Sequence, residues 1–204
     1  MNAHSIPASP VDRVQTAPRS RLLAGMAAVI GRQGYVATTI ADIVAEAGVS
    51  KRTFYEHFAS KADCLIALYE AVNLEGLEVL RACIAPGRPW REQVERALTA
   101  YFGWMSRNPR LVRSLFIDVL ALGQPGLAVR RRVHEQIACF MIAVVQSSPD
   151  LPQPASPDLV AALVGGIHEL VLVRTEQGDG LRAAELAEVG TELVCRVLCS
   201  RSDI

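Results

Sequence analysis

Apolar residues recur with helical spacing along nearly the whole chain after Pro18. The first stripe lies on one face of a predicted helix and consists of Leu22, Leu23, Met26, Ala27 and Ile30. Pro18 suits the first turn of this helix, and Gly34 suits the residue just beyond its end. No segment alternates between apolar and polar residues with a period of two. The pattern therefore predicts an all-α fold of about nine helices.

The C-terminal part of the chain continues the same pattern. An apolar stripe runs over residues 90–105, and Asn108-Pro109 ends that helix and starts another. A loop with four prolines, residues 147–157, precedes the last two helices. These two helices are expected over residues 157–177 and 181–200.

The charge balance excludes a uniformly basic protein but leaves room for a local nucleic-acid site. The 204 residues include 21 Lys and Arg and 21 Asp and Glu, so the formal net charge is zero. Residues 1–61 contain seven basic and four acidic residues, a net charge of +3, and the remainder of the chain carries −3. The asymmetry is modest, and it favours a nucleic-acid site in the N-terminal part.

The cysteines and the apolar runs exclude several other classes of protein. The five cysteines are an odd number and form no Cys-x-x-Cys pair, which argues against a disulfide framework or a zinc ribbon. Residues 1–17 lack the apolar core of a signal peptide, and no apolar run reaches about 18 residues. We therefore expect a cytoplasmic protein that has no membrane span and holds no metal.

The segment TTIADIVAEAGVSKRTFYEHFASKADCL, residues 38–65, predicts two short helices joined by a tight turn and followed by a longer helix. Thr39 and Ser60 each precede an aspartate by three residues, which is the spacing of a capping box. Ser50 can cap the helix between them, and Gly48 can adopt the positive φ of the turn. Two helices joined in this way form a helix-turn-helix, whose second helix enters the major groove of DNA.

The second helix of this motif carries side chains that suit DNA. Phe54 and Phe58 are four residues apart and are expected to face the core. The side chains left outward, which can reach phosphates or base edges, are Lys51, Arg52, Tyr55 and His57. The backbone N–H groups at the helix starts near Thr39 and Lys61 can also bind phosphates.

The same segment contains a series of motifs in a fixed order. They are Gly34-Tyr35, Thr38-Thr39-Ile40-x-x-Ile43, Ala47-Gly48-Val49-Ser50 and Thr53-Phe54-Tyr55-x-His57-Phe58-x-Ser60-Lys61. Together they resemble the DNA-binding domain of tetracycline-repressor (TetR) type regulators, and the resemblance covers about a quarter of the chain, residues 18–65. It implies an all-helical homodimer in which three N-terminal helices bind DNA. The C-terminal helices of such proteins bind a small molecule and dimerise.

The resemblance also implies which residues meet DNA. Lys51, Arg52 and Thr53 are expected at or near the base edges, and Ser50 at the start of their helix belongs to the same DNA-binding set. The residues expected to hold phosphates are Thr39, Tyr55, His57 and Lys61. Glu56, in the same helix, either accepts a hydrogen bond from a cytosine amine or faces away from the DNA.

The chain accordingly divides into an arm and two domains. Residues 1–17 form an arm that we expect to be disordered, although contact with the minor groove stays open. The helix-turn-helix domain covers residues 18–62, and residues 63–204 form the domain for ligand binding and dimerisation.

Two sets of residues in the C-terminal part are candidates for these roles. A small-molecule pocket needs a few polar groups among aromatic side chains, and the candidates are Tyr101, Trp104, Arg113, Phe116, Phe140, Met141, His168 and Glu169. The last two helices carry broad apolar stripes that could pair with a second subunit as a four-helix bundle. The candidates for this interface are Leu163, Ile167, Leu170, Val189, Leu193 and Val197. The stripes could instead serve only the core of one subunit.

The sequence therefore predicts a dimeric transcriptional repressor that a mostly apolar small molecule releases from a pseudo-palindromic DNA operator. The sequence contains two incomplete zinc-protease motifs, His134-Glu135 and His168-Glu169. The second histidine that such a motif needs is replaced by Ala138 and by Leu172. We expect no enzymatic activity and no cofactor. A helical adaptor for another protein and an all-α enzyme without a motif are the alternatives.

Overall fold

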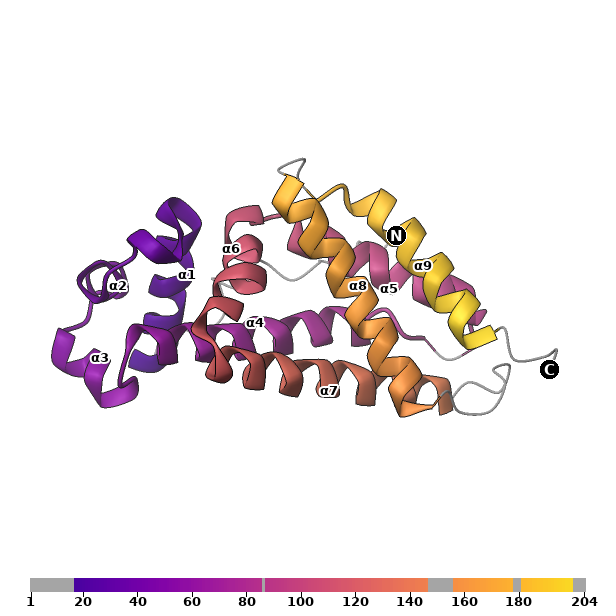
Figure 1. The fold of residues 1–204 in the computed structure, drawn as a ribbon, viewed down its shortest axis with the longest axis horizontal. Coiled ribbons are helices and arrows are strands. Elements are labelled where there is room, and N and C mark those ends of the chain that lie inside the picture. Colours follow the sequence, from indigo (N-terminus) through magenta and orange to yellow (C-terminus); the bar gives the residue numbers. More distant parts are fainter. Residues whose placement is uncertain (1–16, 86, 147–155, 178–180, 200–204) are drawn as a thin grey trace, which may run out of the picture.

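The computed structural model describes residues 17–85, 87–146, 156–177 and 181–199, and every regular element within them is helical (Figure 1). The α-helices are α1 (Pro18–Ala37), α2 (Ile40–Ala47), α3 (Lys51–His57), α4 (Lys61–Arg81), α5 (Trp90–Met105), α6 (Pro109–Arg113), α7 (Gln124–Gln146), α8 (Pro157–Gln177) and α9 (Ala183–Cys199). A π-helical turn at Ser114–Asp118 and a 3-10 turn at Leu120–Leu122 connect α6 to α7. The predicted all-α fold is confirmed, with nine α-helices in the described residues.

The three helices α1, α2 and α3 gather at one end of the molecule, and α4 runs from them along the C-terminal helices (Figure 1). The predicted stripe of α1 forms the core of this group, since Leu22, Met26 and Ile30 are completely buried. Gly25 allows α2 to approach α1 closely, because a Cβ atom at this position would lie 2.9 Å from the carbonyl oxygen of Ile43. This close contact fixes where α2, and α3 after it, are held.

The helix ends follow the predicted capping residues. The Thr39 hydroxyl accepts from the Asp42 N–H at 3.2 Å, and the Asp42 carboxylate accepts from the Thr39 N–H at 2.9 Å, which completes a capping box. Gly48 ends α2 with a φ of 61°. Gly34 has a φ of 80° and interrupts α1 at the predicted end of the first helix, after which one more turn continues to Ala37.

In the C-terminal part, α9 lies along α5 and α8 lies along α7. The segment after Asn108 differs from the single regular helix that the sequence predicts. Asn108 caps α6 by accepting from the Leu111 N–H at 3.1 Å, but α6 ends at Arg113 and the chain continues through the π-helical turn. Leu115 and Val119 are nevertheless buried, so the irregular turns keep the apolar side inward.

The nearly apolar run at residues 159–173 lies within α8. Its most deeply buried residues are Val160, Val164 and Val171, which pack against the other helices of the same chain. Across the residues that the structure describes, no helix combines the length and the apolarity needed to cross a membrane.

Candidate nucleic-acid interface

Helix α3 is the candidate recognition helix, and two phenylalanines anchor it to the domain. Phe54 is completely buried and Phe58 is 5% exposed, and their ring centroids lie 5.7 Å apart. This anchoring confirms the predicted inward face of the helix. The residues that it leaves outward are Lys51, Arg52, Tyr55 and His57, which are all exposed.

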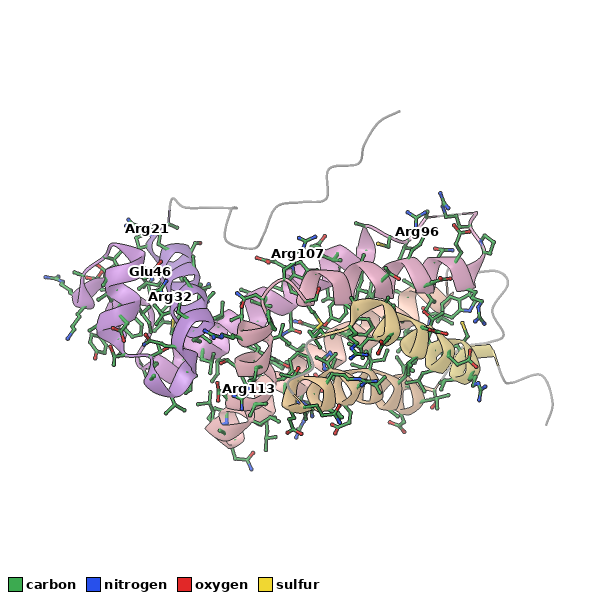
Figure 2. The ribbon with its side chains drawn as sticks, turned by 90° about the horizontal axis from the view of Figure 1, so that it is seen from above. Arg21, Arg32, Glu46, Arg96, Arg107 and Arg113 are labelled. Atoms are coloured by element: carbon green, nitrogen blue, oxygen red, sulfur yellow. The ribbon has the colours of Figure 1, made fainter. Side chains whose placement is uncertain are left out.

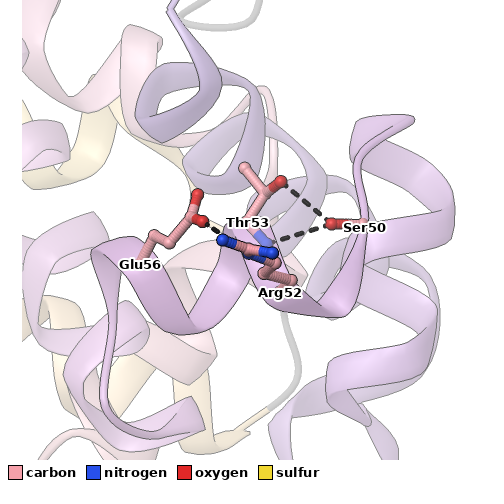
Figure 3. A network of polar contacts seen from close by, with 4 residues as sticks. All are labelled: Ser50, Arg52, Thr53 and Glu56. Atoms are coloured by element: carbon pink, nitrogen blue, oxygen red, sulfur yellow. Dashed lines mark hydrogen bonds and ion pairs between the residues drawn. The ribbon is translucent and has the colours of Figure 1, made fainter.

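The first turns of α3 contain a small network of polar contacts (Figure 3). Ser50 caps the helix by accepting from the Thr53 N–H at 3.0 Å, and its hydroxyl lies 3.0 Å from the Thr53 hydroxyl. The Arg52 Nε donates to the Glu56 carboxylate at 3.1 Å. The sequence leaves two roles open for Glu56, a hydrogen bond to a cytosine amine or an orientation away from the DNA. The structure adds a third role, because the Glu56 carboxylate holds the guanidinium of Arg52. The spacing of four residues is a signal that sequence reasoning could have used.

The start of α2 offers backbone N–H groups beside an exposed surface. Thr39 is exposed, but its hydroxyl already donates to the Asp42 carboxylate at 2.7 Å. The hydrogen bonds from the Thr39 side chain and backbone lower the pKa of Asp42 below its usual value, so the carboxylate is charged at neutral pH. Val36, which precedes this helix, is 87% exposed and was not recognised in the sequence as part of this surface.

Lys61, at the start of α4, is engaged within the protein. Its Nζ donates to the carbonyl oxygens of Tyr35 at 3.0 Å and Thr38 at 2.7 Å, and it lies 4.2 Å from the centroid of the Tyr35 ring. An ammonium group has three donors, so one N–H is left for a phosphate. Sequence reasoning missed this structural role, because both partners lie more than 20 residues away in the chain.

The predicted ligand residues separate into three groups in the structure. Tyr101, Phe140, Met141 and His168 line an internal cavity of about 90 Å³ between α4, α5, α7, α8 and α9. Trp104 and Phe116 instead line a larger groove beside α1, which Tyr101 also reaches. Arg113 and Glu169 are exposed and line neither hollow, because the helical register turns them to solvent.

A histidine pair lies at one wall of the internal cavity. His168 Nδ1 lies 2.7 Å from His134 Nε2, and the ring of Phe116 meets the His168 ring edge-on at 5.3 Å between centroids. Burial lowers the pKa of His168 to about 3 and that of His134 to about 4, so both rings are neutral at pH 7. His134 was not among the predicted ligand residues, since its partner is 34 positions away.

The predicted dimer residues lie partly inside the protomer and partly on its surface. Leu163 and Ile167 are only 3% and 7% exposed, so within one chain they belong to the core. The physical reason is that this side of α8 is needed to cover the core of its own chain. Leu170, Leu193 and Val197 are half-buried, and Val189 is 47% exposed. Val173, which was not predicted, is also exposed on α8.

Comparisons with known proteins bear on the same domains. The model for bacterial regulatory proteins of the tetR family matches residues 22–68. The nucleoid occlusion factor SlmA from Marinomonas sp. (strain MWYL1) is 26% identical over 75% of this chain and 82% of its own length. Two solved structures share the fold: the fatty acid degradation regulator FadR from Bacillus halodurans and the regulator FadR from Bacillus subtilis, the latter in complex with stearoyl-CoA.

The match to these structures extends over nearly the whole chain. The B. halodurans protein has a TM-score of 0.72 and is 14% identical, with 89% of this chain and 96% of that chain covered. The B. subtilis protein has a TM-score of 0.71 and is 16% identical, with 85% and 96% covered. The tetR-family model matches the helices whose capping, anchoring and outward side chains form the candidate DNA surface, and the family contains regulators and not enzymes. Residues 22–68 therefore form a DNA-binding domain of the TetR family of transcriptional regulators, and the chain as a whole shares the fold of the solved regulators.

Proposed function

We propose that this regulator is a dimeric repressor that a mostly apolar small molecule releases from a pseudo-palindromic operator. The observation that carries the proposal is the internal cavity, whose lining is almost wholly apolar and includes Leu80 near the end of α4. Helix α4 begins at Lys61, against the helix-turn-helix domain. One rigid element therefore connects the cavity to the DNA surface.

The DNA contacts follow from the outward side chains of α3. Lys51, Arg52 and Thr53 meet the base edges or their neighbours, with Ser50 at the helix start. The phosphates are held by Thr39, Tyr55, His57 and the remaining N–H of Lys61. Two such helices in successive major grooves read half-sites whose centres are roughly 34–36 Å apart.

A dimer supplies the second recognition helix. Its interface uses the outer sides of α8 and α9, where apolar side chains are exposed or half-buried in the single chain. These residues are Leu170, Val173, Val189, Leu193 and Val197. Gly166 of α8 lies beside Leu193 of α9 and has no side chain. A Cβ atom at position 166 would lie 3.5 Å from Leu193 Cδ2. Two helices from each subunit then form a four-helix bundle about a twofold axis.

Release requires that the ligand bind one dimer geometry more tightly than the other. A ligand with equal affinity for both geometries shifts nothing, and a complete switch needs roughly a 10⁴-fold preference. The effector is mostly apolar because the cavity offers it almost no polar surface. An acyl chain is the first class to test, since a regulator of similar fold binds stearoyl-CoA.

The experiment begins with selection of bound sequences from a random duplex pool. A gel shift on the selected operator is then titrated with hexadecanoate and with hexadecanoyl-CoA, and transcription in vitro is measured from a promoter that contains the operator. We expect a pseudo-palindrome bound by a dimer, release on addition of ligand, and transcription that rises with release.

Two variants of α5 make the test specific to the cavity. Ala97 lines the cavity and is 6% exposed, so Ala97→Leu fills space that a ligand needs, whereas Thr99→Leu changes an exposed residue of the same helix. Ala97→Leu should bind the operator and resist release, and Thr99→Leu should behave as the unmodified protein. Equal release of both variants, or an operator complex that no apolar ligand dissociates, would overturn the proposal.

A further inference from the structure

A second hollow, which we call the junction groove, lies between the helix-turn-helix domain and the C-terminal helices. Its volume is about 550 Å³, and its walls come from α1, the end of α2, α4, the end of α5 and α6. Sites for small molecules usually measure about 300–1,000 Å³ and often lie between domains. The internal cavity of about 90 Å³ is too small by this measure to hold a whole effector, and the junction groove is not.

The junction groove and the internal cavity meet at one aromatic side chain. Tyr101 of α5 is 6% exposed and lines both hollows. Phe116 lines the groove and packs edge-on against His168, which lines the cavity. Gly76 of α4 makes room for the tyrosine, because a Cβ atom at that position would lie 2.9 Å from Tyr101 Cε2. Only a layer of side chains therefore separates the two spaces.

The two hollows differ in polarity. The cavity is lined almost entirely by apolar side chains, while the groove wall also contains charged and amide side chains. The charged residues in the groove wall are Arg21, Arg107, Glu46 and Glu75, and Glu46 forms an ion pair with Arg32 at 2.7 Å; Asn73 and Asn108 add amide groups. Arg107 is exposed at the end of α5 and forms no ion pair with any residue that the structure describes. In Figure 2, Arg107 and Arg21 lie toward the same edge of the molecule, and Arg113 lies toward the opposite edge.

We infer that the junction groove and the internal cavity are two parts of one site for a linear amphiphile. Its apolar chain passes Tyr101 into the cavity, and its anionic head group stays in the groove beside Arg107. The inference rests on the proposed function and names the class of effector. Two kinds of ligand share this chemistry, a free fatty acid and an acyl thioester of a phosphorylated carrier. Both have an unbranched acyl chain with an anionic group at one end.

This placement brings the ligand into contact with the DNA-binding domain itself. Arg21, in the α1 wall of the groove, donates to the carbonyl oxygen of Gly48 at 2.8 Å. Gly48 is the turn residue of the helix-turn-helix and lines the groove as well. The groove that takes the head group therefore shares a wall with the contact that holds the turn before the recognition helix, which gives the effector a short route to α3.

The two tryptophans of the chain provide a direct test, because Trp90 lines the cavity and Trp104 lines the groove. The variants Trp90→Phe and Trp104→Phe each leave one fluorescent reporter. The probes are 16-bromohexadecanoate, brominated at the chain end, and 4,5-dibromohexadecanoate, brominated beside the head, since bromine quenches tryptophan on contact. We expect the chain-end bromine to quench Trp90 and the head-end bromines to quench Trp104. The opposite pattern, or quenching of Trp90 alone by both probes, would overturn the inference.

A charge variant tests the head group separately. Arg107→Gln should weaken binding of hexadecanoate to the full-length protein by roughly tenfold, as expected for loss of one charge-assisted hydrogen bond. The matched control is Arg96→Gln, because Arg96 is exposed on α5, the helix that ends just before Arg107, and lines neither hollow. The same two variants are also assayed with hexadecanoyl-CoA. The ligand whose head group this site favours should show the larger loss of affinity in Arg107→Gln. Equal affinity of both variants for both ligands would overturn the inference.

These results are distinguishable from a failure of the proposed function. Release of the operator by hexadecanoate without quenching of Trp104 would remove the junction groove from the site and leave the repressor proposal standing. If no acyl probe binds and an uncharged apolar compound releases the operator, the inference that the effector is an amphiphile is overturned. The repressor proposal is then still supported.

Discussion

The Nε atom of Arg52 lies 3.1 Å from the Glu56 carboxylate, one helical turn away on the exposed side of α3. The ion pair uses Nε and not the two terminal nitrogens of the guanidinium (Figure 3). The two side chains are 90% and 54% exposed, so the pair adds little to stability, about 0.3–0.5 kcal/mol at most. For the proposed contact with DNA its role is to orient Arg52, because bidentate recognition of guanine needs a fixed guanidinium plane.

Arg52→Ala should relax the base preference of the protein at one position of each half-site. The expected loss is about 1–3 kcal/mol of discrimination, which is the value of one bidentate contact. Glu56→Ala should weaken the same preference at the same position, since the arginine then samples other rotamers. Sequence selection with both variants checks this. If Glu56→Ala instead alters a preference for cytosine at another position, the carboxylate reads a base itself.

Lys51 and Lys61 both belong to the proposed DNA surface, but the structure gives them different roles. Lys51 is exposed, so Lys51→Ala should leave the free energy of unfolding unchanged and reduce the salt slope of DNA binding by about 0.9. Lys61→Ala removes two hydrogen bonds from a charged donor, and should lower the free energy of unfolding by about 1–3 kcal/mol. Urea unfolding and a salt titration measure both quantities. Equal stability of the two variants would contradict the structural role of Lys61.

Val189→Glu should convert the proposed dimer to monomers. Val189 is 47% exposed in the single chain, so the substitution should leave the fold of the protomer intact. In the proposed four-helix bundle the same position is apolar and covered, where a charge without a partner is strongly unfavourable. Sedimentation equilibrium measures the association, with Leu74→Glu on α4 as the control because Leu74 is 51% exposed on a different helix. Dimers that persist in Val189→Glu would place the interface elsewhere.

The features that sequence reasoning recovered are those set by neighbouring residues. The helix-turn-helix depends on caps, a glycine turn and two phenylalanines, and all of these act over three or four positions. Thr39, Gly48 and Phe54 therefore have the predicted roles in the structure. The apolar period also predicted the helices of the C-terminal part, since an amphipathic helix must bury one face whatever it packs against.

The features that it missed depend on which elements pack together. The apolar stripe on α8 has the same pattern in the sequence whether it faces the core of its own chain or a second subunit. In the structure, Leu163 and Ile167 are buried in the core of their own chain. Arg113 was assigned to a pocket for its chemistry, but its place on α6 turns it to solvent. The junction groove is formed by five helices and has no local signature in the sequence at all.

The stability of the protein should fall as the pH decreases from about 7 to 5, because of the pair His134–His168. The pKa of both histidines is lowered in the folded chain by burial first. His134 adds to the lowering for His168, and Arg130 of α7 adds to it for both rings. The unfolded chain therefore binds more protons than the native chain below the unfolded pKa of about 6.5. The neutral pair makes its full contribution to the free energy of unfolding above about pH 6.5. This contribution is lost as the pH falls toward the pKa values of the histidines in the native chain.

The expected size of this effect follows from the depth of the shift. For one histidine that stays neutral in the native state, each pH unit below about 6.5 costs about 1.4 kcal/mol, so the loss at pH 5 is about 2 kcal/mol. Urea unfolding at pH 7.5 and pH 5.0 measures it, and this window lies above the range in which the carboxylate of Asp42, whose pKa is lowered, becomes protonated. The double variant His134→Gln/His168→Gln cannot take up these protons, so it should lose less stability across the window than the unmodified protein. An equal loss in both proteins would show that other groups, and not this buried pair, make the fold sensitive to acid.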